Sequence, residues 1–328
     1  MDRLLKTSCR VFTGLITFAV SLVSMHALAQ VTYPTRPVRF VVPYPPGGSM
    51  DPTARLIGSH LTNLWGQQVV VENRAGGETI IGASVGANAL PDGYTVLYSS
   101  TTFVLIPLLH KNLPYQPFRD FAPVGTVATN EKLLVTHPSV PANNLNELIA
   151  HAKANPGKLN FAMTANGSAN HLANEMLNLT AGIRTLMVPY KGAGPALTDL
   201  LGGHVQLLFA LPVTVIGQVQ RGAVRGIAVS GNTRLSALPS IPTFAELGMG
   251  KLEVSTWQGI LAPAKAPRPI IQKISSDVAK VLASRDTQDK LNAQGSTPFP
   301  STPEQMAVLM KAESARYAKV VEAANIRL

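Results

Sequence analysis

Two short segments of this chain combine glycines, hydroxyl side chains and the expected start of a helix, from which proteins build anion-binding sites without charged side chains. The first is PYPPGGSMD at residues 43–51, which follows an apolar, β-branched strand at residues 38–42 and precedes apolar residues at helical spacing. Backbone amides that converge at a helix N-terminus bind carboxylate or phosphate, because the helix dipole is positive there. We therefore expect the amides of Gly47, Gly48 and Ser49 to form an anion site, with an ordinary strand-to-helix turn as the alternative.

The start of the first helix is predicted from its proline. Pro52 cannot donate a backbone hydrogen bond and disfavours helical geometry at Asp51. The sequence therefore predicts Asp51 as the N-cap and Pro52 as the first helical residue. Gly48 is expected to take a positive φ and to leave room for a ligand close to the backbone, so that a valine there would abolish binding.

The second segment is TANGS at residues 164–168, which follows a predicted strand at residues 159–163. Its asparagine and glycine tolerate left-handed backbone, which allows consecutive amides to point the same way. Ser168 is the expected N-cap of the next helix. His171 would then be the third residue of that helix, where it can bond a ligand oxygen, with capping or core packing as the alternative.

The elements that must hold these segments alternate between strands and helices. Strand-like runs fall at residues 38–42, 69–71, 94–98, 133–136, 159–163, 186–188, 205–209, 224–229 and 254–261. Helical patterns lie between them, for example at residues 52–64, 145–154 and 270–282. This alternation favours an α/β class with largely parallel sheets. Ligands in such sheets bind beyond the carboxyl ends of the strands, where both glycine-bearing segments emerge.

A set of short motifs runs through residues 33–328 in a fixed order. They are YPTRP at 33–37, PYPPGGSMD at 43–51, VENRAGG at 71–77, PDGYT at 91–95, LPY at 113–115, DFAPV at 120–124, NPGKL at 155–159, NGS with HL at 166–172, VPYKG at 188–192 and AP at 262–263. As an ordered set they resemble the Bug family of extracytoplasmic solute receptors, the binding proteins of tripartite tricarboxylate transporters.

The resemblance implies a type II periplasmic-binding-protein fold, in which two α/β domains joined by two crossover segments enclose a ligand cleft. Domain 1 would comprise residues 31–128 and 253–328, and domain 2 residues 129–252. The resemblance also implies that the two loops hold the ligand's carboxylates, partly through water.

The candidate ligand-binding residues lie on these two loops and after the neighbouring strands. They are Tyr44, Pro46, Gly47, Gly48, Ser49, Met50, Asp51, Ser100, Thr101, Asn166, Gly167, Ser168, Ala169, Asn170, His171 and Tyr190. Tyr44 and Phe103 are candidates to pack against the body of the ligand, with a place in the core as the alternative.

The chain departs from the family pattern at a position that concerns the ligand. The family usually carries an aspartate after the strand at residues 205–209, where this chain has Ala210 and Leu211. An ammonium group would be poorly served, so we expect a C4 to C6 dicarboxylate or a small aromatic acid. Because Arg55 and Arg74 lie beyond the expected anion-binding turns, we expect neutral donors and not an arginine clamp.

The N-terminus has the pattern of a secretory signal at residues 1–29. A basic region precedes an apolar run at residues 11–25, and ALA directly precedes Gln30. The run is shorter than the ~20 residues that span a bilayer, so cleavage near Ala29 and export to the periplasm are favoured over a membrane anchor. The single cysteine, Cys9, lies before this run, so neither a disulfide nor a lipid anchor is expected in the mature chain.

The remaining composition argues against nucleic-acid binding, catalysis and metal binding. The formal net charge of +10 can steer anions, but no basic run with interleaved aromatics accompanies it. No nucleophile motif, phosphate-binding fingerprint or metal-like histidine spacing is present. We expect a monomeric receptor, not an enzyme, without cofactor or metal, that delivers its ligand to a membrane permease. An exported α/β hydrolase or lyase, or a sensor feeding a two-component kinase, are the alternatives.

Overall fold

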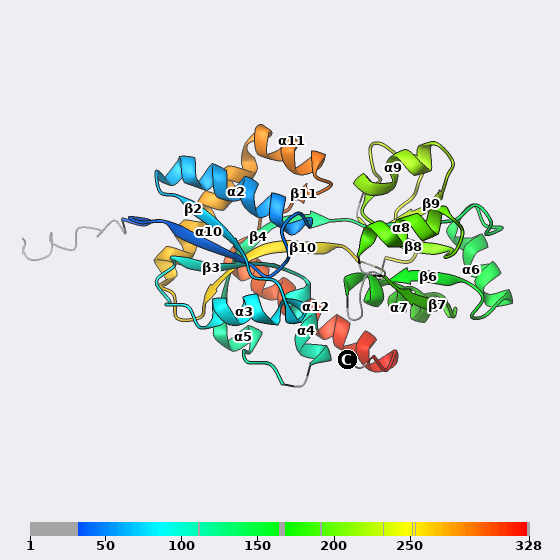
Figure 1. Cartoon of the computed structure of the whole chain (residues 1–328), viewed down its shortest axis with the longest axis horizontal. Coiled ribbons are helices and arrows are strands. Elements are labelled where there is room, and N and C mark those ends of the chain that lie inside the picture. Colours follow the sequence, from blue (N-terminus) through cyan, green and yellow to red (C-terminus); the bar gives the residue numbers. More distant parts are fainter. Residues whose placement is uncertain are drawn as a thin grey trace, which may run out of the picture. The chain divides into compact units, whose positions relative to one another are not determined.

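The computed structural model describes residues 32–110, 112–163, 168–190, 192–231, 233–250, 252 and 254–326. Between residues 34 and 326 the chain builds two sheets, each covered by helices (Figure 1). The predicted α/β class is confirmed. The N-terminal signal predicted at residues 1–29 lies outside the described residues.

The first sheet has six strands in the order β11-β4-β10-β3-β1-β2. They are β1 (Val38–Val42), β2 (Val69–Asn73), β3 (Thr95–Ser100), β4 (Phe121–Asn130), β10 (Thr256–Pro263) and β11 (Thr297–Pro298). Sequence analysis did not predict β4, because Pro123 and Gly125 interrupt its apolar run. Pro123 pairs with Leu261 next to an irregularity in the β4–β10 register, where a missing amide is tolerated.

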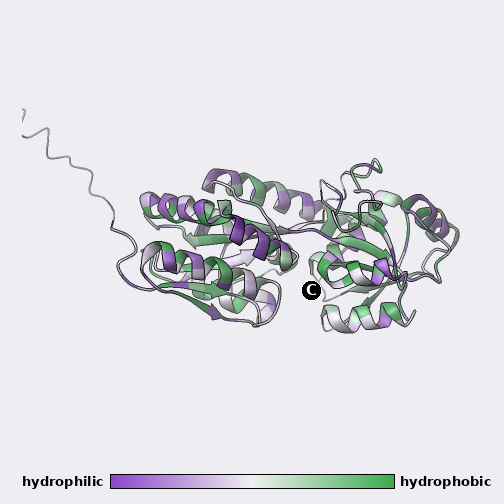
Figure 2. Cartoon of the chain, turned by 90° about the horizontal axis from the view of Figure 1, so that it is seen from above, coloured by the Kyte–Doolittle hydropathy of each residue, from purple (hydrophilic) through white to green (hydrophobic). Residues whose placement is uncertain are grey.

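Helices cover both faces of this sheet. They are α2 (Met50–Trp65), the 3₁₀ helix η1 (Gly77–Thr79), α3 (Ile80–Ala87), α4 (Thr102–Leu109), α5 (Pro117–Asp120), α10 (Arg268–Ala283), α11 (Arg285–Ala293) and α12 (Pro303–Ala323). Helices α2, α10 and α11 pack together, and α12 packs against α4 (Figure 1). Apolar residues follow the strands and the inward sides of the helices, as Figure 2 shows, and these buried side chains form the core.

The second sheet has five strands in the order β7-β6-β8-β5-β9. They are β5 (Leu133–Thr136), β6 (Asn160–Met163), β7 (Leu186–Pro189), β8 (Leu207–Ala210) and β9 (Arg225–Val229). Its helices are α6 (Leu145–Ala154), α7 (Ala169–Ala181), α8 (Ala193–Leu201) and α9 (Pro212–Gln220). Residues of α6 and α7 share a core with Leu134 and Phe209, whereas those of α8 and α9 share one with Leu133 and Leu208. Neighbouring strand residues therefore face opposite helix layers.

Both sheets are mixed, so the expectation of largely parallel sheets was wrong. β1 runs parallel to β2 and β3, but β10 is antiparallel to β3 and β4. In the second sheet, β6 is parallel to β7 and β8, but β5 is antiparallel to β8 and β9. The antiparallel pairs involve the strands that carry the chain between the sheets. A chain that leaves along β4 and returns along β10 must run in opposite directions on the two.

Each sheet and its helices form one lobe, named the first and the second after the sheets. Helix α12 contributes to the cores of both lobes. Met306 and Met310 pack with Trp257 in the first lobe, whereas Tyr317 and Val320 belong to the cluster that contains α6 and α7. Among the described residues, no helix combines the length and the apolar character needed to cross a membrane.

Candidate functional site

The strand directions place the candidate loops of both lobes next to residues 131–132, a segment that connects the two sheets. β3 and β4 run in the same direction, since both are antiparallel to β10. The chain therefore leaves the first sheet after Asn130, at the edge where the loops following β1 and β3 emerge. β5 begins with Leu133 opposite Ala210, the last residue of β8. Residues 131–132 thus join the carboxyl edge of one parallel set to the carboxyl edge of the other.

On the first lobe, helix α2 begins earlier than the sequence predicted. Ser49 is the N-cap and Met50 the first helical residue, so the assignment of Asp51 as N-cap was wrong. Ser49 already has helical backbone angles. Pro52 lies within the first turn, where amides have no partner inside the helix, so its missing N–H costs nothing there.

Asp51 closes the glycine turn instead of capping the helix. Its Oδ2 accepts a hydrogen bond from the Gly47 amide at 3.2 Å, and its Oδ1 forms an ion pair with Arg55 Nε at 3.0 Å. Burial raises the pKa of Asp51, but hydrogen bonds from Arg55, Gly47 and Asn73 and the Arg55 charge outweigh it, so the pKa lies below its usual value. The charges of Asp51 and Arg55 therefore compensate each other.

This closure changes which amides are available. The Gly47 amide is taken by Asp51, whereas the amides of Gly48 and Ser49 donate no hydrogen bond within the part of the chain that the structure describes. Pro46, Gly47, Gly48 and Ser49 are exposed and Met50 is buried. A positive φ occurs at Gly47, +81°, and not at Gly48, so that expectation for Gly48 was wrong. The residue with left-handed backbone in this turn is therefore Gly47, one position before the predicted Gly48.

The arginines near this loop are engaged with their own lobe. Arg55 Nη2 donates to Asn73 Oδ1 at 2.8 Å, and Arg74 pairs with Glu72. Asn73 Nδ2 in turn donates to the carbonyl of Tyr44 at 3.1 Å. Both arginines thus have partners within their own lobe, and the expectation of neutral donors stays a prediction.

The hydroxyl groups near the ends of β1 and β3 form a connected cluster. Tyr44 Oη and Ser100 Oγ lie 2.6 Å apart, and Ser100 Oγ donates to Thr102 Oγ1 at 3.3 Å. Burial raises the pKa of Tyr44, so its phenol stays neutral near pH 7. Thr101 is completely buried, and its Oγ1 accepts a hydrogen bond from the amide of Trp257 at 3.1 Å. Thr101 therefore ties this cluster to strand β10.

Phe103 belongs to the core. It is 1% exposed and stacks on Tyr115 at 6.0 Å between ring centroids, with Phe121 edge-on at 5.0 Å. Of the two proposed aromatic contacts, only the half-buried Tyr44 remains beside the glycine loop.

On the second lobe, Ser168 is the N-cap of α7, as predicted. Its Oγ accepts a hydrogen bond from the amide of His171 at 3.3 Å. Asn170 Nδ2 donates to the carbonyl of Phe209 at 2.8 Å, which fixes the first turn of α7 over the end of β8. His171 is buried, and burial lowers its pKa, so the ring is neutral at pH 7. Ala169 is partly buried beside the same core.

The other two predicted contacts of the second loop, Asn166 and Gly167, lie outside the described residues. Tyr190 follows β7, and its amide donates to the carbonyl of Met163 at 2.7 Å. Its phenol donates to Asp199 Oδ2 at 2.6 Å, and burial together with this carboxylate raises the pKa of Tyr190 to about 12. The phenol of Tyr190 is thus hydrogen-bonded to α8.

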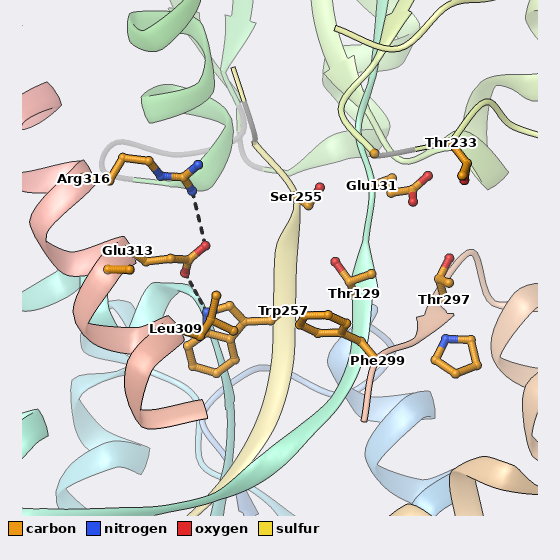
Figure 3. A pocket seen from close by; sticks show the side chains of 13 residues that line it. Thr129, Glu131, Thr233, Ser255, Trp257, Thr297, Phe299, Leu309, Glu313 and Arg316 are labelled. Carbon is orange, nitrogen blue, oxygen red and sulfur yellow. Dashed lines mark hydrogen bonds and ion pairs between the residues drawn. The ribbon is translucent and has the colours of Figure 1, made fainter. Parts of the chain in front are cut away.

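A cavity of about 440 Å³ lies where β4 and β10 leave the first sheet (Figure 3). Glu131, Ser255 and Trp257 line it from the connecting strands, and Glu313 and Arg316 line it from α12. Trp257 Nε1 donates to Glu313 Oε2 at 2.6 Å, and Glu313 pairs with Arg316 at 3.3 Å. None of the sequence-selected residues that the structure describes lines this cavity.

Sequence analysis overlooked Lys132, which lies in the link between the two carboxyl edges. No motif surrounds it, but a lysine directly before three consecutive apolar residues of a short strand is a signal that sequence inspection can detect. Among the described residues, no group of three or more acidic, histidine or cysteine side chains could hold a metal ion.

Comparisons with known proteins agree on one family. Residues 53–326 match the model described as tripartite tricarboxylate transporter family receptor. The chain is 38% identical to Protein BugT of Bordetella pertussis over 299 residues, covering 90% of this chain and 92% of that protein. It is 36% identical over 313 residues to the UPF0065 protein in the tcbD-tcbE intergenic region of Pseudomonas sp. strain P51, covering 95% of this chain and 93% of that protein.

Solved structures give the same result. The Rhodopseudomonas palustris protein Rpa4515 with adipate superposes with a TM-score of 0.77 at 34% identity, covering 90% of this chain and 99% of that one. MatC of the same organism, with bound malate, gives a TM-score of 0.73 at 30% identity, covering 88% and 100%. The periplasmic binding protein BugD gives a TM-score of 0.73 at 33% identity, covering 90% and 99%.

Proposed function

The chain belongs to the family of tripartite tricarboxylate transporter receptors, and from that premise we propose that it captures a small carboxylate between its domains in the periplasm and delivers it to the membrane subunits of such a transporter. Proteins of this family are solute receptors and not enzymes, so the hydrolase or lyase alternative falls away. A role in sensing remains the second candidate.

The observation that carries the proposal is the junction of two carboxyl edges at residues 131–132. One edge presents the N-terminus of the 16-residue helix α2, with the amides of Gly48 and Ser49 outside any described hydrogen bond. The other presents the N-terminus of α7. Two positive helix ends on either side of one link suit a molecule with a carboxylate at each end.

We propose domain 1 as residues 31–128 and 253–328, and domain 2 as residues 129–252. The strands lie close to these bounds: β4 ends at Asn130, two residues past the first bound, β5 begins at Leu133, and the chain re-enters the first sheet with β10 at Thr256. We also propose that residues 1–29 are an export signal cleaved near Ala29 and that the mature receptor is a monomer.

For the ligand, we propose a C4 to C6 dicarboxylate ahead of a small aromatic acid. The adipate of Rpa4515 and the malate of MatC are dicarboxylates of this size in similar proteins. Burial of Phe103 leaves one fewer ring to stack on an aromatic ligand. Ala210 ends β8 without an acidic side chain, so an ammonium group finds no partner there.

The test is a thermal-shift screen of the mature protein against organic acids, amino acids, sugars and divalent metals, followed by calorimetry on the positives. A ligand at about 100 times its Kd should stabilise the protein by ~2.7 kcal/mol. We expect succinate, malate or adipate to raise Tm. A shift with amino acids, sugars or metals alone would overturn the proposal.

A further inference from the structure

Lys132 is a cation without a partner in the link between the two carboxyl edges. Neither a hydrogen bond nor an ion pair of its ammonium is found within the described residues. The residue is partly exposed, and desolvation by the surrounding protein lowers the pKa of Lys132 to about 8. A desolvated ammonium that pairs with nothing is costly, so proteins retain one where it does something.

The backbone fixes the direction in which this side chain leaves the strand. The Lys132 amide donates to Ser230 Oγ at 2.7 Å, and its carbonyl accepts from the Ser230 amide at 2.8 Å. These bonds extend the pairing of β5 with β9 by one residue beyond Leu133 and Val229. Lys132 is therefore held in extended geometry, in which successive side chains point to opposite faces.

The packing of neighbouring residues shows which helices cover each face of the strand. Leu133 packs with α8 and α9, whereas Leu134 packs with α6 and α7. Glu131, in phase with Leu133, lines the cavity of Figure 3. Lys132, in phase with Leu134, belongs to the opposite face and does not line that cavity. Residue 132 therefore lies on the α7 face of the extended strand.

The first turn of α7 covers this side of the sheet edge. Leu134 is opposite Phe209, whose carbonyl accepts the side-chain amide of Asn170. Lys132 lies two residues from Leu134 toward the carboxyl end of β8, ~7 Å along the strand. The register therefore places Lys132 at the same sheet edge as the N-terminus of α7, where Ser168 and His171 begin the helix. The cationic residue and the positive end of the α7 dipole thus share one sheet edge, and no ion pair of Lys132 is found within the described residues.

We propose that Lys132 is the charged contact for one carboxylate of the ligand and that it makes the receptor prefer dicarboxylates to monocarboxylates. This inference rests on the proposed function. One carboxylate meets the neutral amides of Gly48 and Ser49, and the second meets the Lys132 ammonium together with the N-terminus of α7. A monocarboxylate fills only one of these places and leaves the buried cation unpaired.

The deciding variant is Lys132→Met, which keeps the length of the side chain and removes the charge. The probes are adipate against hexanoate and succinate against butyrate, measured by calorimetry at pH 7. We expect the variant to bind the better dicarboxylate roughly 30-fold or more weakly, because a buried charge contact is lost. Its affinity for the matching monocarboxylate should change little.

Stability gives a second readout that a merely structural lysine would not produce. Without ligand, Lys132→Met should raise Tm by roughly 2 °C or more, because an unpaired buried charge is removed. Lys132→Arg should retain most of the affinity for dicarboxylates. Lys311→Met, at an exposed position on α12, is the matched control and should change neither quantity.

The outcomes separate the two proposals. If the unaltered protein binds none of the four acids and no other organic acid of the thermal-shift screen, the carboxylate function fails and the role of Lys132 fails with it. If that protein binds adipate or succinate and Lys132→Met binds it within threefold, only the role of Lys132 is overturned. An equal loss for both members of a pair would overturn the selectivity for dicarboxylates.

Discussion

The two sides of the proposed cleft differ in whether their charged side chains have a counter-charge. On the α2 side, Asp51 and Arg55 neutralise each other and a glycine amide completes the group. On the α7 side, Lys132 has no counter-charge among the described residues. In such a site the α2 side defines the geometry of the bound ligand, and the α7 side supplies the charge that complements it.

The comparison also separates two adjacent glycines. Gly47 has a φ of +81°, whereas Gly48 does not need the left-handed region, and a Cβ there would meet only the Pro45 carbonyl oxygen at 3.7 Å. Gly47 is thus required by the turn itself, and Gly48 faces open space beside the amides assigned to the ligand. Two substitutions and a pH dependence test the difference between the two sides.

The largest effect is expected from Gly48→Val. The branched side chain would occupy the space above the Gly48 and Ser49 amides, so affinity for the carboxylate should fall roughly 100-fold or more. Circular dichroism and Tm should stay close to those of the unaltered protein, because the fold leaves room for the Cβ. Unchanged affinity in calorimetry would show that the loop is only a turn.

A smaller effect, on stability first, is expected from Gly47→Ala. An alanine at positive φ costs roughly 1–2 kcal/mol, so the free energy of unfolding measured in urea should fall by about that amount. Gly66→Ala at the C-terminus of α2, with a φ of +65° and open space around it, is the matched control. It should lose similar stability and keep its affinity, whereas Gly47→Ala should lose both.

The smallest effect is a difference between Asp51 and Lys132 in how their contributions to folding stability depend on pH. The folded pKa of Asp51 is lowered, so its contribution to stability is present above the unfolded pKa of about 3.9 and is lost as pH falls through the folded value. The folded pKa of Lys132 is also lowered, to about 8, so its penalty is complete below pH 8. The penalty is relieved between there and the unfolded pKa of about 10.4.

Thermal melts of the ligand-free protein at pH 7 and pH 10 test the lysine part of this expectation. The gain in Tm on Lys132→Met should be present at pH 7 and should largely vanish at pH 10. A gain that is the same at both values would mean that the ammonium is not buried.

The sequence alone determined the α/β class, the family and several local features. The side chain of Ser168 caps α7 as predicted, because a serine before a helical pattern acts on an amide three residues away. Helix α6 occupies residues 145–154, the predicted range, because Asn144 and its apolar spacing both act within one helix. Such features are local, so a single sequence carries them.

Tertiary structure decided what depends on residues far apart in the chain. The sequence left Phe103 open between ligand and core, and its stacking with Tyr115 and Phe121 placed it in the core. Asp51 left the N-cap position because Arg55 and the Gly47 turn gave its carboxylate another partner. Lys132 became a candidate only when the register of β5 with β8 and β9 showed which helix its side chain faces. Pairing between strands distant in sequence sets that direction, and no local pattern contains it.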